Sequence, residues 1–392
     1  MRIVHFAVTP LAGAPLRIVQ MLNAHTGHSA RLVDLCRYGT EDFGQDVVFS
    51  ETPELAMELA AQADIIHFHN YLDLDNTQFA PIDFRALQRK GTLFIRHFHS
   101  HPDLVASRMG ITAKALLAQD IPALVIAQFQ ERYYPKAHVV PNFVPEHDPL
   151  YLPATAPLRH DVFYSPTNFR DAWDCRWNTK AAPQTHCAIM AACKKADASW
   201  VLVHKTPLRR TLALKQASRI VVDDLTTGSY HLTGLEALSQ GKPVLAYLDE
   251  RTRSIMQHFS GSAENPFINI KLEDALPVLN YLLAAPDEAA EIGMASREFM
   301  LTRWRSDEMV QRISEAYAML AHDPASVTRQ PELQLDCCSR RFFALTLPDI
   351  IHTSRKARDK AQIRPQNPPM HLMDEETADA ADTTVALNKQ VA

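Results

Sequence analysis

The stretch "RIVVDDLTTGSYHLTGLEALSQGKPVLAY", residues 219–247, reads as a strand, a loop, a helix and a second strand in immediate succession. Its first six residues are an arginine, three apolar β-branched residues and two acids, which predicts a buried strand. Leu232, Leu235 and Leu238 then recur at helical spacing. The loop between this strand and these leucines therefore leads from the carboxyl end of a strand to the N-terminus of a helix.

The same alternation runs through most of the chain. Short apolar strands separated by helical patterns are typical of a parallel sheet with helices on both faces. The sequence predicts an α/β protein with two doubly wound Rossmann-like domains facing a cleft, where ligands of such sheets bind. The predicted strands are 2–8, 31–35, 64–70, 92–99, 123–128 and 138–142, and then 161–165, 199–205, 219–224, 243–247 and 266–270.

The domain boundaries follow from this pattern. Residues 1–150 form the predicted first domain, and the polar, proline-containing stretch 151–160 opens the second, which extends to residue 305. A helix over 306–325 is expected to return toward the first domain. Residues 326–392 are basic and apolar at first and then polar and acidic, and we expect disorder over 365–392.

Composition excludes several classes of protein. With 392 residues the chain is too long for one ordinary core, and its net charge of -5 does not suit an electrostatic nucleic-acid binder. The six cysteines form no Cys-x-x-Cys pair, which favours free thiols in a reducing compartment. The start resembles a strand rather than a signal peptide, and no apolar run is long enough to span a membrane. We therefore expect a cytoplasmic protein.

The loop and helix within 219–247 suit a nucleotide. Free N–H groups and the positive end of the helix dipole attract phosphate. The carboxylate of Glu236 can accept two hydrogen bonds from adjacent hydroxyl groups, such as those of a ribose. The simpler interpretation is that Glu236 only favours the dipole from the first turns of the helix.

The segment "GLEALSQGKPVLAY" (234–247) resembles the donor site of GT-B glycosyltransferases. The likeness is to the large retaining family, family 4-like, that includes many bacterial polysaccharide and lipopolysaccharide transferases. Weaker resemblances lie in the same order as in that family: "DIIHFHN" (64–70), "VVPNFV" (139–144) and "FYSPTNFRDAWDCRWNTKAA" (163–182). Together these segments cover most of residues 1–320.

The resemblance implies an activity. The first domain would bind the acceptor and the second a nucleotide-diphosphate sugar, whose sugar is transferred to a hydroxyl group of a carbohydrate or lipid-linked acceptor. Retention of configuration, independence of metal and other cofactors, and a role in bacterial surface polysaccharide or glycolipid synthesis are implied as well. Nucleic acid is not an expected partner.

The resemblance also assigns residues. Glu236 would hold the ribose, and cations would stabilise the charge of the departing nucleoside diphosphate. For each cation the alternative is a solvated surface side chain. The diphosphate loop would consist of Gly228, Ser229, Tyr230 and His231, and the catalytic cations of Arg176, Lys180 and Lys205.

Two positions depart from the family. Ser229 stands where the family usually has a further Glu, seven residues before the ribose Glu, and the glycine pair after the first strand is reduced to Gly13. The identity of the donor sugar is therefore open. A non-catalytic GT-B-like binding subunit is the alternative.

Histidines gather at two strand ends. In "HFHSH", His97, His99 and His101 alternate and would share one face of a strand, where three imidazoles can bind zinc. A metal-dependent hydrolase is therefore a competing class. "HFHN" adds His67 and His69. We expect His67, His69, His97 and His99 to line the cleft with Gly13 and contact acceptor or donor hydroxyls, without a metal.

The tail contains "RRFFALTLPDII" (340–351), in which two arginines precede an apolar run. Basic residues beside Phe and Leu suit an interface with anionic lipid, which would place the protein peripherally at the inner face of a membrane. The alternative is that these apolar side chains pack on the second domain.

Overall fold

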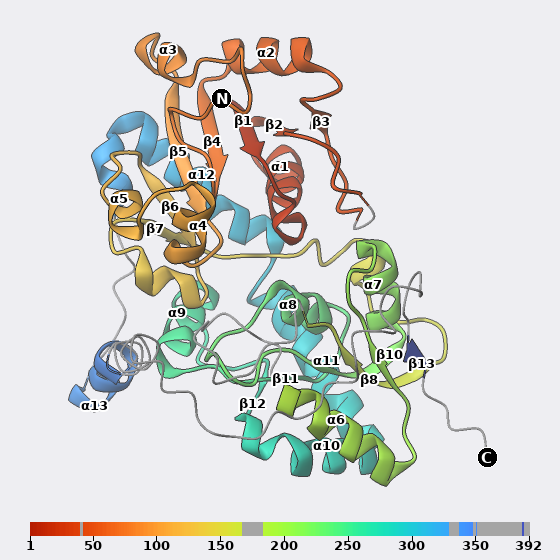
Figure 1. Ribbon diagram of the computed structural model, residues 1–392. Helices are drawn as coiled ribbons and strands as arrows, with labels where there is room; N and C mark the ends of the chain where they lie inside the picture. Colours follow the sequence, from red (N-terminus) through yellow and green to blue (C-terminus); the bar gives the residue numbers. More distant parts are fainter. Residues whose placement is uncertain (40–41, 167–182, 329–336, 348–349, 351–385, 388–392) are drawn as a thin grey trace.

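The computed structural model of the protein describes residues 1–39, 42–166, 183–328, 337–347, 350 and 386–387 (Figure 1). Two sheets form the two halves of the fold, the N-terminal sheet at the top of Figure 1 and the C-terminal sheet at the bottom. The predicted α/β class with two doubly wound sheets is confirmed. Each predicted strand segment contains a strand of the structure, and β3 and β13 are additional.

The N-terminal sheet is parallel, with the strand order β3-β2-β1-β4-β5-β6-β7. The buried residues of its central strands are apolar apart from histidines and Arg96, because helices cover both faces. The strands are β1 (Arg2–Ala7), β2 (Ser29–Asp34), β3 (Val47–Val48), β4 (Ile65–His69), β5 (Leu93–Phe98), β6 (Ala123–Ile126) and β7 (His138–Val140).

The C-terminal sheet has the order β12-β11-β10-β8-β9-β13. All of its pairs are parallel except the one between β9 and the short β13. We expected disorder over 365–392, and β13 is the only part of that range that the structure describes. The strands are β8 (His160–Tyr164), β9 (Trp200–Leu202), β10 (Ser218–Val222), β11 (Val244–Ala246), β12 (Ile268–Asn269) and β13 (Ala386–Leu387).

Local signals explain where the helices begin and end. Helix α9 starts at Asp249, whose side chain accepts a hydrogen bond from the Thr252 N–H, and stops at Gly261 in the left-handed region (φ 63°). The helices are α1 (Ala14–His25), α2 (Pro53–Gln62), α3 (Phe84–Arg89), α4 (Pro102–Arg108), α5 (Ala113–Leu117), α6 (Pro183–Ala196), α7 (Leu208–Gln216), α8 (Leu232–Ser239), α9 (Glu250–Ser260), α10 (Ala275–Ala284), α11 (Pro286–Thr302), α12 (Ser306–His322) and α13 (Cys338–Arg341).

Helix α12 follows the C-terminal sheet in the chain but packs on the N-terminal one. The Glu146 carboxylate accepts the Ser306 N–H at its first turn, where negative charge favours the helix dipole. Further along, the Gln311 side chain donates to the His25 carbonyl oxygen and Ser314 bonds His28. One continuous group of buried apolar side chains runs from the N-terminal sheet into the C-terminal one.

The tail segment 337–347 lies against α9. Arg340 forms an ion pair with Glu250 at 3.5 Å and donates to Gln257 at 3.4 Å. In the π-helical turn η7 (Phe342–Thr346), Ala344 is buried, while Phe342 and Phe343 are 43% and 50% exposed. The segment therefore docks through one side and presents aromatic side chains on another. None of the helices in the described ranges is both long and apolar enough to cross a bilayer.

Candidate functional site

The loop after β10 is shaped by two buried acids. Asp224 accepts hydrogen bonds from the N–H groups of Thr226 (2.7 Å) and Thr227 (3.0 Å), which fixes a turn. Asp223 accepts from the His231 N–H at 2.7 Å, at the start of α8. A Cβ at Gly234 would lie 2.6 Å from an Asp223 carboxylate oxygen, so glycine is required for this close approach of helix and strand.

The predicted diphosphate loop is packed against the adjoining α9 and the N-terminal half. Gly228 has a φ of 89°, and its carbonyl oxygen accepts from the Asp249 N–H and the Thr252 hydroxyl. The Tyr230 hydroxyl donates to the Ala127 carbonyl oxygen at 3.1 Å, at the carboxyl end of β6. Ser229 and Tyr230 are both buried, and His231 is partly exposed. This loop is therefore a joint between the two halves of the fold.

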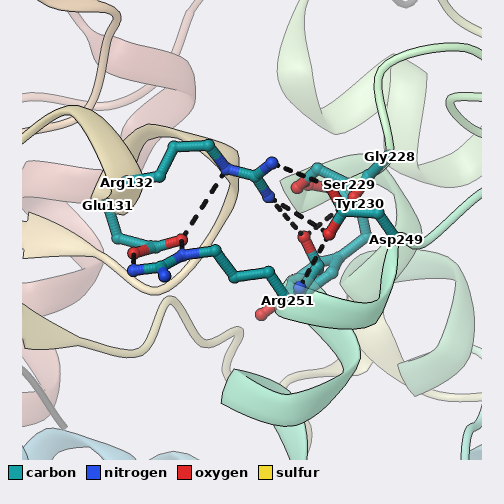
Figure 2. Close-up of polar contacts among 8 residues, drawn as sticks. Glu131, Arg132, Gly228, Ser229, Tyr230, Asp249 and Arg251 are labelled. Atoms are coloured by element: carbon teal, nitrogen blue, oxygen red, sulfur yellow. Dashed lines mark hydrogen bonds and ion pairs between the residues drawn. The ribbon is translucent and has the colours of Figure 1, made fainter. Parts of the chain in front are cut away.

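Two ion pairs tie the same joint, as Figure 2 shows. Both come from the 3-10 turn η3 (Phe129–Tyr133) of the N-terminal half. The Arg132 guanidinium contacts both Asp249 carboxylate oxygens, at 2.8 and 3.1 Å. The carboxylate of Glu131 accepts two hydrogen bonds from Arg251, at 2.7 and 2.6 Å. Such two-point contacts fix orientation as well as distance.

The Glu236 carboxylate, predicted to hold the ribose, is 5% exposed and already has two cationic partners. Arg17 of α1 donates to one oxygen at 2.7 Å, and the Lys215 ammonium of α7 lies 2.5 Å from the other. Burial alone would raise the pKa of Glu236, but the charges of Lys215 and Arg17 outweigh it and hold the pKa below its usual value. Arg17 also bonds the Tyr151 hydroxyl, so this cluster joins the two halves.

The remaining predicted residues of this part of the site are the three catalytic cations and Gly13 of the cleft. Lys205 follows β9, is exposed and has a positive φ of 45°. Gly13 (φ 78°) begins α1, and a Cβ there would lie 3.8 Å from Leu208 of α7. Arg176 and Lys180 lie outside the described residues.

The predicted histidines form one buried layer with His5, which the sequence analysis did not single out. They lie on the face of the N-terminal sheet that α1 and α12 cover. In register, His5 pairs with His67 and His69 pairs with His97. The rings of His5 and His67 stack with centroids 4.2 Å apart. All are fully buried except His99, which is partly exposed.

These imidazoles are neutral near pH 7. Burial lowers the pKa of His5 and of His99 to about 3, and the His99 charge adds to the effect at His5. The pKa values of His67, His69 and His97 lie well below the usual value, mainly through burial and also through mutual repulsion. A layer that stays uncharged can remain inside an apolar core.

His101 does not join this layer. Strand β5 ends at Phe98, so the alternation expected over 97–101 breaks, and His101 becomes the N-cap of α4. Its Nδ1 accepts the Asp103 N–H at 3.2 Å. The predicted His97–His99–His101 grouping is therefore wrong, and the histidine that comes beside His97 and His99 is His69.

Several site residues gave no signal in the sequence. Arg17, Lys215 and Arg132 are single cations in segments that look like ordinary solvated surface. Tyr317 lies on α12, far along the chain, and its hydroxyl contacts His67 Nδ1 (2.6 Å) and His5 Nε2 (3.2 Å). The one detectable signal was His5, which alternates with buried apolar residues within the first strand.

Comparison with known proteins identifies the fold. No protein-family model and no curated protein matches the sequence. The chain is similar to an alpha-glucosyltransferase solved in complex with UDP and a 13-mer DNA containing a HMU base, with a TM-score of 0.56 and 13% identity over 82% of this chain and 99% of that chain. An alpha-glucosyltransferase in complex with UDP-glucose and DNA containing an abasic site gives a TM-score of 0.52, with the same identity and coverage. The protein has the GT-B fold.

Proposed function

We propose that this protein is a glycosyltransferase that moves a sugar from a nucleotide-diphosphate sugar to a hydroxyl group of an acceptor. The joint between the two sheets is the observation that supports this most directly. The loop that leads from β10 to α8 lies beside carboxyl-end segments of the N-terminal sheet, linked by Tyr230–Ala127 and Arg132–Asp249. Ligands of doubly wound sheets bind beyond these strand ends. The solved alpha-glucosyltransferases contain UDP or UDP-glucose, which favours a uridine donor here.

The proposed roles follow from chemistry and resemblance. Glu236 holds the ribose hydroxyls through lone pairs that remain after Arg17 and Lys215 have taken one site on each oxygen. Lys205 stabilises the departing diphosphate together with Arg176 and Lys180. The diphosphate lies near the loop 228–231. With these cations no divalent metal is needed for transfer, and configuration is retained.

The acceptor and the cellular setting are proposed from the resemblance. The first domain binds a carbohydrate or lipid-linked acceptor, in bacterial surface polysaccharide or glycolipid synthesis. The enzyme works in the cytoplasm. Exposed Phe342 and Phe343, next to Arg340 and Arg341, support peripheral contact with an anionic membrane face.

One observation favours a second candidate, a non-catalytic GT-B-like binding subunit. Both Glu236 oxygens are engaged within the chain, and Ser229 replaces the acid that the resembled family has at that position. Such a subunit would bind nucleotide weakly or not at all and would act through another protein.

Calorimetric titration of the full chain with UDP, UDP-glucose, GDP and ADP, followed by a sugar-transfer assay with simple glycoside acceptors, tests the proposal. We expect binding of one base and slow release of the diphosphate. Lys205→Ala should cut turnover at least about tenfold, while Arg209→Ala, an exposed cation of the neighbouring helix, should not. Weak binding without turnover would favour the non-catalytic subunit. The absence of both binding and turnover would refute the proposal.

A further inference from the structure

The layer of buried histidines contains a preorganised group at the carboxyl ends of β4 and β5. One ring nitrogen from each of His69, His97 and His99 lies within 4.8 Å of the other two. Asn70, fully buried directly after β4, holds the strand ends together: its side-chain oxygen accepts the His99 N–H at 2.7 Å and its side-chain nitrogen donates to Ser100 at 3.0 Å. The backbone that carries His99 is therefore fixed beside the backbone that carries His69.

Some polar atoms in and beside this group are buried without a hydrogen-bond partner among the described residues. In the part of the chain that the structure describes, both ring nitrogens of His97, which is 1% exposed, have no hydrogen-bond partner, and neither has His67 Nε2. A buried polar group without a partner costs about 1–3 kcal/mol. His97 pairs with His69 of β4 across the sheet, and its ring centroid is 4.1 Å from that of His99. A ligand for nitrogen lone pairs would resolve the deficit.

We propose that His69, His97 and His99 form a binding site for a divalent transition-metal ion, and that zinc fits it best. Neutral imidazole is the ligand that zinc, copper and nickel share, and three imidazoles with an open fourth position are a common zinc set. Tetrahedral zinc, with Zn–N distances of about 2.0–2.1 Å, places its nitrogens about 3.3 Å apart. His69 Nδ1 and His99 Nε2 are already 3.0 Å apart, and a nitrogen of His97, within 4.8 Å of both, completes the set by side-chain rotation.

The surrounding contacts fit this assignment. If His69 binds metal through Nδ1, its Nε2–H donates to His5 Nδ1, 3.0 Å away. His5 Nε2–H then donates to the Tyr317 oxygen, and the Tyr317 hydroxyl donates to His67 Nδ1. Metal-bound histidines usually donate their second N–H to such a partner, which orients the ring. Tyr317 and His5 are therefore positioning residues, and one consistent set of tautomers serves the whole chain of contacts.

The alternative triad of His5, His67 and His69 meets the same distance condition. All three of its members are fully buried, whereas His99 is partly exposed and offers a path from the surface. His5 and His67 also share the Tyr317 hydroxyl, which already uses one nitrogen of each. The site at the strand ends is the accessible one.

Zinc titration of the chelator-treated full chain by calorimetry tests the proposal, with cobalt as a spectroscopic substitute. We expect about one ion per chain, a tetrahedral cobalt spectrum without thiolate bands, and a metal-dependent rise in Tm. His97→Leu and His99→Ala should each weaken zinc binding at least about tenfold. His147→Ala, a histidine with an exposed side chain, is the matched control and should bind as the wild type does.

Cys337 and Cys338 are adjacent in the sequence, and their exposed thiols need their own control, because thiolates also bind zinc. A variant with Ser at both positions should keep the ion. Retention of that ion by both His97→Leu and His99→Ala, or its loss in the double Ser variant, would overturn the proposal, as would a wild-type chain that binds no zinc. Each of these measurements is independent of sugar transfer, so failure of this proposal can be distinguished from failure of the proposed function.

Discussion

The two sheets have opposite polar chemistry at their carboxyl ends. At the ends of β4 and β5 in the N-terminal sheet, the polar groups that face α1 and α12 are uncharged imidazoles. Some of them stack on or hydrogen-bond to one another, and in the part of the chain that the structure describes neither nitrogen of His97 has a partner. Around the C-terminal sheet the polar groups are acids, and Glu236 and Asp249 are each matched by cations. The comparison indicates that the chain supplies counter-charges for the acids of this charged region, whereas in the neutral region of the N-terminal sheet it supplies no partner, among the described residues, for the His97 nitrogens.

The largest effect is expected from breaking the charged region. Glu236→Ala leaves Arg17 and Lys215 buried without their counter-charge, and removing one partner of a buried pair costs about 3–5 kcal/mol. Urea unfolding monitored by tryptophan fluorescence measures this loss. Glu273→Ala, at an exposed site, should change the free energy of unfolding by less than about 0.5 kcal/mol. A loss below about 1 kcal/mol at Glu236 would mean that its carboxylate is free for a ligand.

Low pH should destabilise the charged region. The folded pKa of Glu236 lies below its ordinary value of 4.5, so the folded state binds fewer protons than the unfolded state as pH falls past 4.5. The stability from the ion pairs is therefore fully present above about pH 4.5 and is lost at lower pH, by up to about 1.4 kcal/mol per pH unit.

The comparison variant is Glu236→Gln, which cannot ionise. The difference in unfolding free energy between it and the wild type should be constant from about pH 8 to pH 5 and should shrink below about pH 4.5. A difference that shrinks already between pH 7 and pH 5 would contradict the assignment to Glu236.

Substitution of a histidine in the neutral region should raise the free energy of unfolding, whereas substitution of Glu236 in the charged region should lower it. In the metal-free protein, His97→Leu replaces a buried ring with two unpartnered nitrogens by an apolar side chain of similar volume, so we expect a gain of about 1–2 kcal/mol. Thermal unfolding with chelator present measures it, and His147→Ala should show no change. Destabilisation by His97→Leu would mean that its ring packing outweighs its unpaired nitrogens.

Both sheets could be predicted from the sequence because their strands are continuous apolar runs separated by helical patterns. The loop and helix around Glu236 could be predicted as well, since glycine is typical of a loop and leucines at helical spacing are typical of a helix. Short β3 was missed because two valines carry no periodic signal. The partners of Glu236 could not be predicted, because Arg17 and Lys215 lie 219 and 21 residues away along the chain and only tertiary packing brings them together.

The histidine layer, too, could be predicted only in part from the sequence. The alternation in "HFHN" and "HFHSH" placed His67, His69, His97 and His99 near one sheet edge, but it did not show where β5 ends, so His101 was grouped with them. Which nitrogens are satisfied depends on Tyr317 of α12, a helix that returns from beyond the second sheet. No local pattern encodes that contact.

The smallest effect should come from Tyr317→Phe, which measures how strongly the neutral contacts hold together. Without the hydroxyl, His67 Nδ1 and His5 Nε2 lose their shared partner inside the core. Neutral hydrogen bonds contribute about 0.5 kcal/mol each at the low end of their range, and the phenylalanine ring still fills the same space, so we expect the loss of the two contacts to cost about 1 kcal/mol in unfolding free energy. Tyr281→Phe is the matched control, because that hydroxyl also has a partner, Glu288, but is exposed to water that can replace it. Equal losses at the two tyrosines would show that burial adds nothing to the Tyr317 contacts. A loss confined to Tyr317, accompanied by weaker zinc binding in the same variant, would tie the stability of the neutral region to the orientation of His69.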